Sequence, residues 1–339
     1  MKPLVLHGAL LVVAAGLAYS VWNKDAPAPE KQQAMVDVWG GTQASFSKLS
    51  FEGKTRKVRL EGKKDALGYY YVATVDKEDV PPADPHAGVP GAPLKAPDGK
   101  EPKKETSRFV SVKAAETLVK SLAPLQALRA VGKVEAGRNE EFGLDKPDGT
   151  LKVTIDGKEH VLVIGGTTPG GSERYARYQN SGEVFAISGD IAQSLMFGDS
   201  RLPERELHGF KNEEVSKVRL QKAGKTRELV RVKDKNEGWG DVATPTKQDE
   251  TAGNWMSKLG RLRGSDFLEK PAKALRPEDA LVRVEYFDGS KSIGFVELYK
   301  VPGEKGNDYL ARTEWDRWYV KVPANSAEQV EQDLASVLK

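Results

Sequence analysis

Alternating apolar and polar residues predict a tight β-hairpin near the middle of the chain. Apolar residues occupy every second position over 151–155, Asp156-Gly157 follows, and an apolar run resumes over 161–164. A period of two is typical of a strand with one buried face, and Asp-Gly favours a two-residue turn. The same pattern returns over 281–296, where Asp288-Gly289 supplies the turn. The sequence therefore predicts two related hairpins.

The elements around these hairpins recur in one order, which predicts an internal duplication. The first copy has predicted strands over 46–51, 57–60 and 68–73, a helix over 111–131 that Pro124 kinks or divides, the hairpin, a strand pair over 174–187, and a helix over 191–197 capped by Asp190. The second copy has predicted strands over 215–220, 228–232 and 238–240, a helix over 251–262, the hairpin, strands over 309–312 and 318–320, and a helix over 326–338.

A helix with one apolar stripe buries that stripe on a sheet, so each copy should be a mainly antiparallel sheet with packed helices. We predict an α+β fold class with two tandem, internally duplicated units over 45–200 and 201–339. A length of 339 residues suits two such domains.

The N-terminus carries an apolar run over residues 4–22 that ends at Asn23-Lys24-Asp25. This length is sufficient to cross a bilayer as a helix, and the positive N-terminal end favours a cytoplasmic start with the remainder outside. We expect residues 1–23 to be a single-pass transmembrane anchor; a cleaved signal segment is the alternative, because Ala18-Tyr19-Ser20 presents small residues. Residues 24–44 are expected to be a linker, because the stretch Ala26-Pro27-Ala28-Pro29 is rich in Pro and Ala and has no periodicity.

Two other stretches are rich in glycine or proline. Residues 80–106 contain too much Pro and Gly for a regular element and indicate a flexible insertion in the first unit. The Gly-rich stretch 165–172 resembles a phosphate-binding loop, but it lacks the Lys of that motif and no helix pattern follows it. We expect a mobile connection between strands, and whether its backbone amides bind a ligand stays open.

Composition excludes several classes of function. The chain has no Cys, which removes disulfides, thiolate nucleophiles and iron–sulfur clusters. A net charge of +3 from 52 basic and 49 acidic residues does not indicate the excess of basic charge that nucleic-acid binding proteins have. The sequence therefore predicts no nucleic-acid partner.

Candidate chemistry is sparse. The four histidines are His7, His86, His160 and His208, and none has a second histidine at metal-ligand spacing. No Gly-x-Ser-x-Gly motif for a nucleophilic serine occurs. The carboxylates are dispersed along the sequence, so a hydrolase that uses paired carboxylates is the weakest hypothesis. We predict no catalytic, cofactor-binding or metal-ligating residues, no cofactor, and no enzyme activity.

Aromatic residues gather in two places. Trp239, Trp315, Trp318 and Tyr319 suit either an exposed partner surface or core positions on strands, and exposure distinguishes the two. The three consecutive tyrosines 69–71 suit either a stacking platform or a strand with one packed face.

The run Phe142-Gly143-Leu144-Asp145-Lys146-Pro147, the hairpin that ends at Ile164-Gly165-Gly166, and Arg174-Tyr175-Ala176-Arg177 resemble the bacterial family catalogued as domain of unknown function 4340 (DUF4340). The likeness is weaker in the second unit, where the motif survives only as 275–279. Gly143 and Pro147 also suit a junction between a helix and a strand. The resemblance implies an envelope protein with one membrane segment, associated with ABC-transporter components of the gliding-motility type, and it supplies no catalytic residues.

Two functions follow from these observations. The first is a non-enzymatic accessory or docking module in the bacterial inner membrane, with residues 4–22 as anchor, the C-terminal region in the periplasm, and a membrane protein complex as partner. The alternative is a binding protein for a small ligand, glycan or peptide, which uses the cleft between the two units. The partner, the cargo and the oligomeric state are not predicted.

Overall fold

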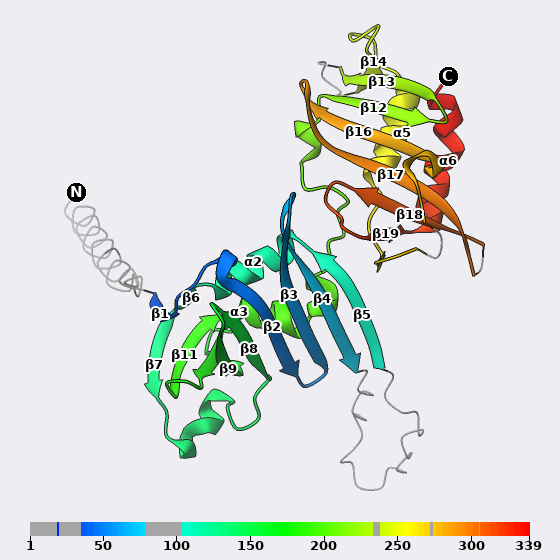
Figure 1. Cartoon of the computed structure of the whole chain (residues 1–339). Coiled ribbons are helices and arrows are strands. Elements are labelled where there is room, and N and C mark those ends of the chain that lie inside the picture. Colours follow the sequence, from blue (N-terminus) through cyan, green and yellow to red (C-terminus); the bar gives the residue numbers. More distant parts are fainter. Residues whose placement is uncertain (1–18, 20–34, 79–103, 233–237, 272–273, 305) are drawn as a thin grey trace, which may run out of the picture.

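The computed structural model describes residues 19, 35–78, 104–232, 238–271, 274–304 and 306–339. These residues form two large antiparallel sheets with packed helices, which confirms the α+β class (Figure 1). No helix within the described ranges is long and apolar enough to cross a membrane. The expected anchor 1–23, except Tyr19, and most of the insertion 80–106 lie outside these ranges.

The first sheet has nine strands in the order β5-β4-β3-β2-β8-β9-β10-β11-β7, and all neighbouring pairs are antiparallel. The strands are β2 (Phe46–Gly53), β3 (Arg56–Asp65), β4 (Gly68–Glu78), β5 (Lys104–Ser111), β7 (Arg129–Lys133), β8 (Gly149–Ile155), β9 (Lys158–Thr167), β10 (Glu173–Tyr178) and β11 (Glu183–Ser188). A separate pair joins β1 (Val36–Trp39) to β6 (Leu125–Ala127). The fold therefore begins inside the expected linker 24–44, and β5 begins inside the expected insertion.

Three helices accompany this sheet: α2 (Lys113–Leu122), α3 (Gly189–Met196) and the short α4 (Gly198–Arg201). The buried residues of β8 are Gly149, Leu151, Val153 and Ile155, which fits the period of two in the sequence. The apolar stripe of α2 is buried with them in one core. Helix α3 is capped by the Ser188 hydroxyl, which accepts from the Asp190 backbone amide, so the prediction that Asp190 is the cap was wrong.

The predicted helix over 111–131 is also only partly correct. Helix α2 ends at Leu122, and residues 125–133 form β6 and β7 instead. Pro124 has no backbone N–H for the helical ladder and disfavours helical backbone in the residue before it. After this break the apolar residues Leu125 and Ala127 are buried on alternate positions, as in a strand.

The second sheet has eight strands in the order β14-β13-β12-β16-β17-β18-β19-β15. They are β12 (Lys217–Lys222), β13 (Lys225–Arg231), β14 (Trp239–Asp241), β15 (Asp266–Leu268), β16 (Val282–Asp288), β17 (Lys291–Gly303), β18 (Gly306–Thr313) and β19 (Tyr319–Val322). The accompanying helices are α5 (Glu250–Gly260) and α6 (Ala324–Val337).

The two sheets share one strand order. Without the additional edge strand β5, the first sheet reads β4-β3-β2-β8-β9-β10-β11-β7, and each position has a counterpart of the same connectivity in the second sheet. The helices occupy corresponding positions in the two halves. Helix α2 contacts β4, and α5 contacts β14, the counterpart of β4. Helix α3 contacts β10, and α6 contacts β18, the counterpart of β10.

Both predicted hairpins are present. Asp156 and Gly157 form the two-residue turn between β8 and β9, and both have positive φ, 49° and 73°. In the second hairpin Asp288 still pairs with Lys291, so the turn residues are Gly289 and Ser290, and the prediction of an Asp288-Gly289 turn was wrong by one residue. A bulge between Tyr286 and Phe287 accompanies this one-residue difference between the two turns.

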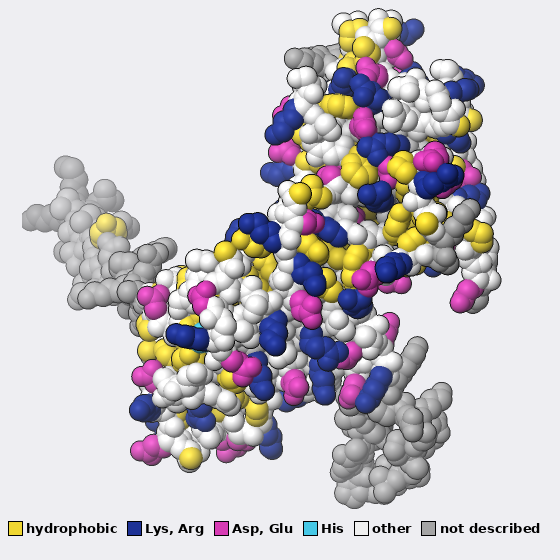
Figure 2. All heavy atoms as spheres, in the orientation of Figure 1, with side chains coloured by type: hydrophobic (Ala, Val, Ile, Leu, Met, Phe, Trp, Pro, Cys, Tyr) yellow, Lys and Arg dark blue, Asp and Glu magenta, His cyan; other side chains and the backbone are white. Residues whose placement is uncertain are grey.

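The two halves meet where β15 lies against β5 (Figure 1). Phe267 of β15 packs against both cores, and its ring centroid lies 5.8 Å from that of Phe109. Arg317 adds a two-bond ion pair to Asp65, with both distances 3.0 Å. Figure 2 shows hydrophobic side chains gathered on this face near the junction, with charges of both signs spread over both halves.

Candidate functional site

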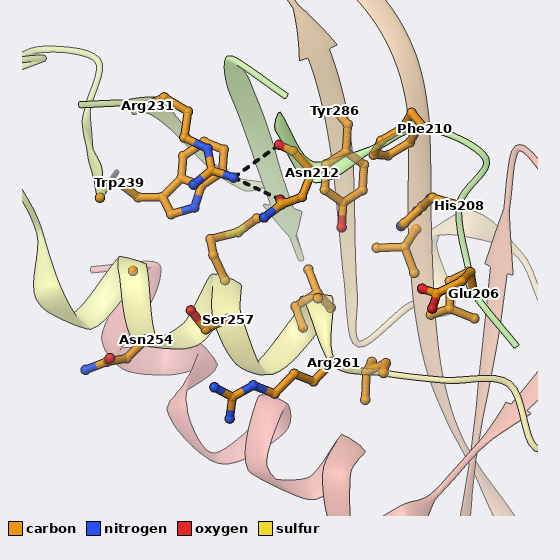
Figure 3. A pocket seen from close by; sticks show the side chains of 18 of the residues that line it. Glu206, His208, Phe210, Asn212, Arg231, Trp239, Asn254, Ser257, Arg261 and Tyr286 are labelled. Carbon is orange, nitrogen blue, oxygen red and sulfur yellow. Dashed lines mark hydrogen bonds between the residues drawn. The ribbon is translucent and has the colours of Figure 1, made fainter. Parts of the chain in front are cut away.

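A cavity of about 710 Å³ lies in the second half of the molecule, between α5 and the segment that connects the two halves (Figure 3). Its volume falls within the usual range for small-ligand pockets. All of its lining residues come from 206–296, so it does not lie between the two units, where a ligand cleft was expected. One wall is α5, the opposite wall is formed by the ends of β13 and β14, and aromatic residues form the floor.

The middle of the α5 wall is made of small or apolar residues, and Glu250 stands at its N-terminal end. Helix α5 starts at Asp249, whose side chain accepts from the Ala252 amide at 3.0 Å. Trp255 is buried on the other side of the helix and donates to the Val330 carbonyl of α6 at 2.9 Å. This orientation turns Gly253 and Gly260 toward the cavity, and a Cβ added at either would meet no atom within 4 Å.

Helix α2 presents a different surface at the same place in the first half. Its solvent-facing residues include Glu116 and Lys120, which form an ion pair at 2.6 Å. The buried residues of α2 and α5 have the same spacing, with Ala115 equivalent to Ala252, so Glu116 and Gly253 occupy equivalent positions on the two helices. The charged face of α2 is a solvated surface, whereas α5 offers open space above glycine and serine.

The opposite wall is rigid and polar. The Arg231 guanidinium lies over the Trp239 ring, 4.4 Å from its centroid. It also donates to the Asn212 side-chain oxygen at 2.9 Å and to the Asn212 carbonyl at 3.2 Å (Figure 3). Stacking and hydrogen bonding together fix the planar guanidinium.

Tyr286 is the central residue of the floor. Its ring packs against Phe210 and His208, with centroids 5.1 and 4.7 Å away, and only 6% of the residue is exposed. Among the described residues the hydroxyl has no hydrogen-bond partner, and it points into the cavity toward α5 (Figure 3). Burial, with a smaller effect of Glu314, raises the pKa of Tyr286 above its ordinary value, so the hydroxyl stays neutral. The hydroxyl oxygen is open to the cavity rather than enclosed, so it is free to donate to a group bound there.

The charges around the mouth of the cavity are unequal. Arg263 pairs with Glu206 at 3.1 Å, and His208 pairs with Glu314 at 3.2 Å. The Arg261 guanidinium has neither a carboxylate nor another hydrogen-bond partner in the described part of the chain. Glu250, at the other end of α5, also lines the cavity and has no ion-pair partner among the described residues, so the cavity has a cation at one end and a carboxylate at the other.

The histidines serve different purposes. His160 stacks on Trp39 at 4.8 Å and hydrogen-bonds Tyr178 at 2.7 Å, and burial lowers its pKa, so it is a packing residue of the first half. His208 lines the cavity, while His7 and His86 lie outside the described residues. Within the ranges that the structure describes, no group of three His, Asp or Glu side chains is placed to hold a metal ion.

The motif 142–147 and the Gly-rich stretch 165–172 are structural partners. Gly143 ends the 3₁₀ helix η2 (Ala136–Phe142) in the left-handed region, with φ of 63°. A Cβ at Gly143 would lie 2.5 Å from the Gly166 nitrogen, and one at Gly165 would clash with the Phe142 carbonyl. Gly165 and Gly166 belong to β9, so the connection between strands is only 168–172 and is shorter than predicted.

The aromatic clusters are largely packed. Trp239 is buried in the cavity wall, Trp318 lies under Arg108 at the junction, Trp315 packs beside Gly209, and Tyr319 contacts Tyr299. Tyr71 is buried, and Arg317 lies over Tyr70. These contacts favour packing roles and a role at the junction over a single exposed aromatic surface.

The fold and the cavity define an α+β protein of two similar antiparallel sheets with a ligand-sized cavity in the second. The chain belongs to the DUF4340 family, whose description is "Domain of unknown function", and the family model matches residues 95–280. This match covers the second part of the first half and the cavity helix α5. No curated protein matches the chain, and no solved structure does.

Sequence reasoning did not find the cavity. Its residues come from the connecting segment, four strands and α5, and only folding brings them together. One signal was present, because Gly253, Ser257 and Gly260 share one side of a helix whose counterpart α2 carries charges.

Proposed function

We propose that this protein is a non-enzymatic binding module of the bacterial cell envelope. Residues 4–22 anchor it as a single pass in the inner membrane, and the folded region faces the periplasm. It acts as an accessory or docking subunit of a membrane protein complex of the ABC-transporter or gliding-motility type. The apolar run of the N-terminus and the family resemblance support this proposal.

We further propose that the two halves arose by duplication of one unit. The shared strand order and the matching positions of the helices support this origin. Duplication gives a tandem module whose halves have diverged, since α2 has a charged outer face and α5 lines a cavity. The second half is then the specialised one.

The second candidate function is ligand binding in this cavity. The single observation that favours it is the Tyr286 hydroxyl, which faces the cavity from a residue only 6% exposed and has no hydrogen-bond partner among the described residues. A pocket with a few convergent polar groups over an apolar floor is the usual form of a binding site. The two functions are compatible, because a docking subunit can also recognise a ligand.

Topology is testable because the chain has no cysteine. We expect Asn325→Cys, at an exposed position in the first turn of α6, to react with a membrane-impermeant maleimide in cells with a permeabilised outer membrane. Lys2→Cys should react only after lysis. Labelling of Lys2→Cys without lysis, or protection of Asn325→Cys, would contradict a periplasmic fold.

Docking is testable by crosslinking in intact cells, followed by purification in detergent and identification of the captured proteins. We expect membrane-complex subunits to be recovered with the full chain and lost when residues 4–22 are replaced by a cleavable signal peptide. Recovery of no membrane-complex subunit would sink the docking proposal. It would leave ligand binding in the cavity to be judged separately.

A further inference from the structure

We propose that the cavity in the second half binds a short extended peptide with a free terminal carboxylate, which lies along α5 and reaches Arg261. This inference rests on the second candidate function, ligand binding in the cavity, and specifies the class of ligand.

The cavity has the length of a short peptide. Glu250 and Arg261 line its two ends on α5 and are eleven positions apart in the sequence. At about 1.5 Å per residue this is roughly 16 Å along the helix. An extended chain rises about 3.3 Å per residue, so roughly five residues span the distance.

The walls suit a peptide backbone. Gly253 and Gly260 leave open space above α5, so a second backbone can approach the helix closely. Asn254 and Ser257 of α5 line the cavity together with Asn212 and Gln248, and these groups both donate and accept. A peptide presents donors and acceptors along its whole length and matches both walls.

Glycans and fatty acids match less well. Sugar sites usually need an open aromatic face, but Arg231 covers Trp239, and Tyr286 is flanked by His208 and Phe210. A fatty acid would bury the amide and hydroxyl groups of the walls without hydrogen bonds, which is costly.

Two residues give the site its polarity. Arg261 supplies a guanidinium at the mouth that has no carboxylate partner within the described ranges, and a guanidinium matches a carboxylate in a two-bond geometry. Deeper in the cavity, the Tyr286 hydroxyl donates to a peptide carbonyl and so gains the partner that it lacks. Met256 and Leu259 receive the apolar side chains of the peptide.

The test is affinity selection with the full chain in mild detergent. Three probes are compared: a random pentapeptide pool with free carboxyl termini, the same pool with amidated termini, and a mixture of tetrasaccharides of glucose and N-acetylglucosamine. Rapid gel filtration separates bound from free probe, and mass spectrometry identifies what is retained. Affinities of the retained peptides are then measured by calorimetry.

Three variants separate binding from folding. Tyr286→Phe keeps the ring contacts and removes only the unpaired hydroxyl, and Arg261→Gln removes the charge; each should weaken peptide binding roughly tenfold. Gly253→Leu fills the cavity from a position where an added Cβ meets no atom within 4 Å, and it should abolish binding. Its unfolding midpoint should be at or above that of the unchanged chain, because Gly disfavours helix. Glu116→Leu, at the corresponding position of α2, is the control and should bind normally.

The outcomes are distinct. Retention of the acid pool over the amidated pool, lost in Gly253→Leu, supports the inference. Equal retention of both peptide pools, or retention of a glycan that Gly253→Leu abolishes, overturns the claim that the ligand is a peptide recognised by its terminal carboxylate. Either result is still consistent with ligand binding in the cavity. Binding that Gly253→Leu does not change places the ligand elsewhere, and retention of none of the probes counts against cavity binding itself.

Discussion

Asp316 is a carboxylic acid whose surroundings oppose its ionisation. It lies buried between β18 and β19, where it accepts from the Thr313 hydroxyl at 3.0 Å. Burial raises the pKa of Asp316 to about 7; the Thr313 hydrogen bond lowers it, whereas the charges of Glu314 and Glu204 add to the rise and that of Arg317 opposes it. Near neutral pH the group is therefore close to half protonated.

This shift predicts a pH-dependent stability. Below the unfolded pKa of 3.8 the acid is neutral in both states and costs nothing. Between that pH and about 7, Asp316 ionises in the unfolded chain but keeps its proton in the folded chain, so the free energy of unfolding falls as pH rises. Above about 7, Asp316 is ionised in both states and the loss in the free energy of unfolding stays constant. Asp316→Asn should stabilise the protein by up to roughly 4 kcal/mol at pH 8 and by nothing at pH 3.5. Denaturant unfolding at several pH values checks this, and an equal gain at both extremes would contradict it.

Gly143 makes a second prediction at the scale of one residue. Its positive φ and its approach to Gly166 leave no room for a side chain. Gly143→Ala should lower the free energy of unfolding by about 2 to 4 kcal/mol. The control is Gly137→Ala in the same 3₁₀ helix, where an added Cβ meets no atom within 4 Å. Similar losses in the two variants would refute this account of the family motif.

At the scale of elements, helix α2 depends on a residue that lies far away in sequence. Glu204, in the segment between the halves, accepts from the backbone amides of Val112 and Ala114 at 3.2 and 2.8 Å. The helix has no cap from its own Val112 side chain. A carboxylate at this end satisfies free N–H groups and complements the helix dipole.

Glu204→Ala should therefore destabilise the first half by about 1 to 2 kcal/mol. Hydrogen exchange of the first turn of α2, read by mass spectrometry, should accelerate as the cap is lost. Glu206→Ala in the same segment removes an exposed ion pair with Arg263 and should leave α2 unchanged. Slow exchange at α2 in Glu204→Ala would rule out the capping role.

The contrast between predicted and unpredicted elements has a physical basis. The hairpins were predictable because alternation and an Asp-Gly turn act over a few residues. The end of α2 was misplaced because Leu125 and Leu128 keep helical spacing with Leu118 and Leu122, and only Pro124 signals the change to strand. The Glu204 cap and the unpaired Tyr286 hydroxyl result from contacts between distant segments, so no local pattern indicates them.

At the scale of the whole molecule, the two halves are held by a small set of contacts. Arg317 pairs with Asp65 and lies over Tyr70, and Arg108 pairs with Glu269 and lies over Trp318. The hydrogen bond from Arg317 lowers the pKa of Asp65, because it stabilises the ionised carboxylate. The contacts come from strand ends and loops.

Arg317→Ala should weaken the junction by about 1 kcal/mol, since the pair is partly exposed. We expect faster hydrogen exchange in the turn between β3 and β4 and in 313–318, with the two cores unchanged. Arg276→Ala removes a local pair with Asp279 within the second half and should not affect the junction. Unchanged exchange in Arg317→Ala would show that the remaining junction contacts, Phe109 with Phe267 and Arg108 with Glu269, hold the halves together without it.

The contact between β15 and β5 also bears on solubility. Strand β5 is the outer strand of the first sheet and pairs only with β4, so its eight residues present a row of backbone groups without a strand partner; β15 contacts β5 but does not pair with it. Such a row is a template for adding strands from other molecules. At the far end of the second sheet, β14 has only three residues and includes Gly240, so it offers little for another chain to pair with. The second half contacts this edge through β15, so a first half released by proteolysis in the envelope would expose more of β5 and be more prone to aggregate.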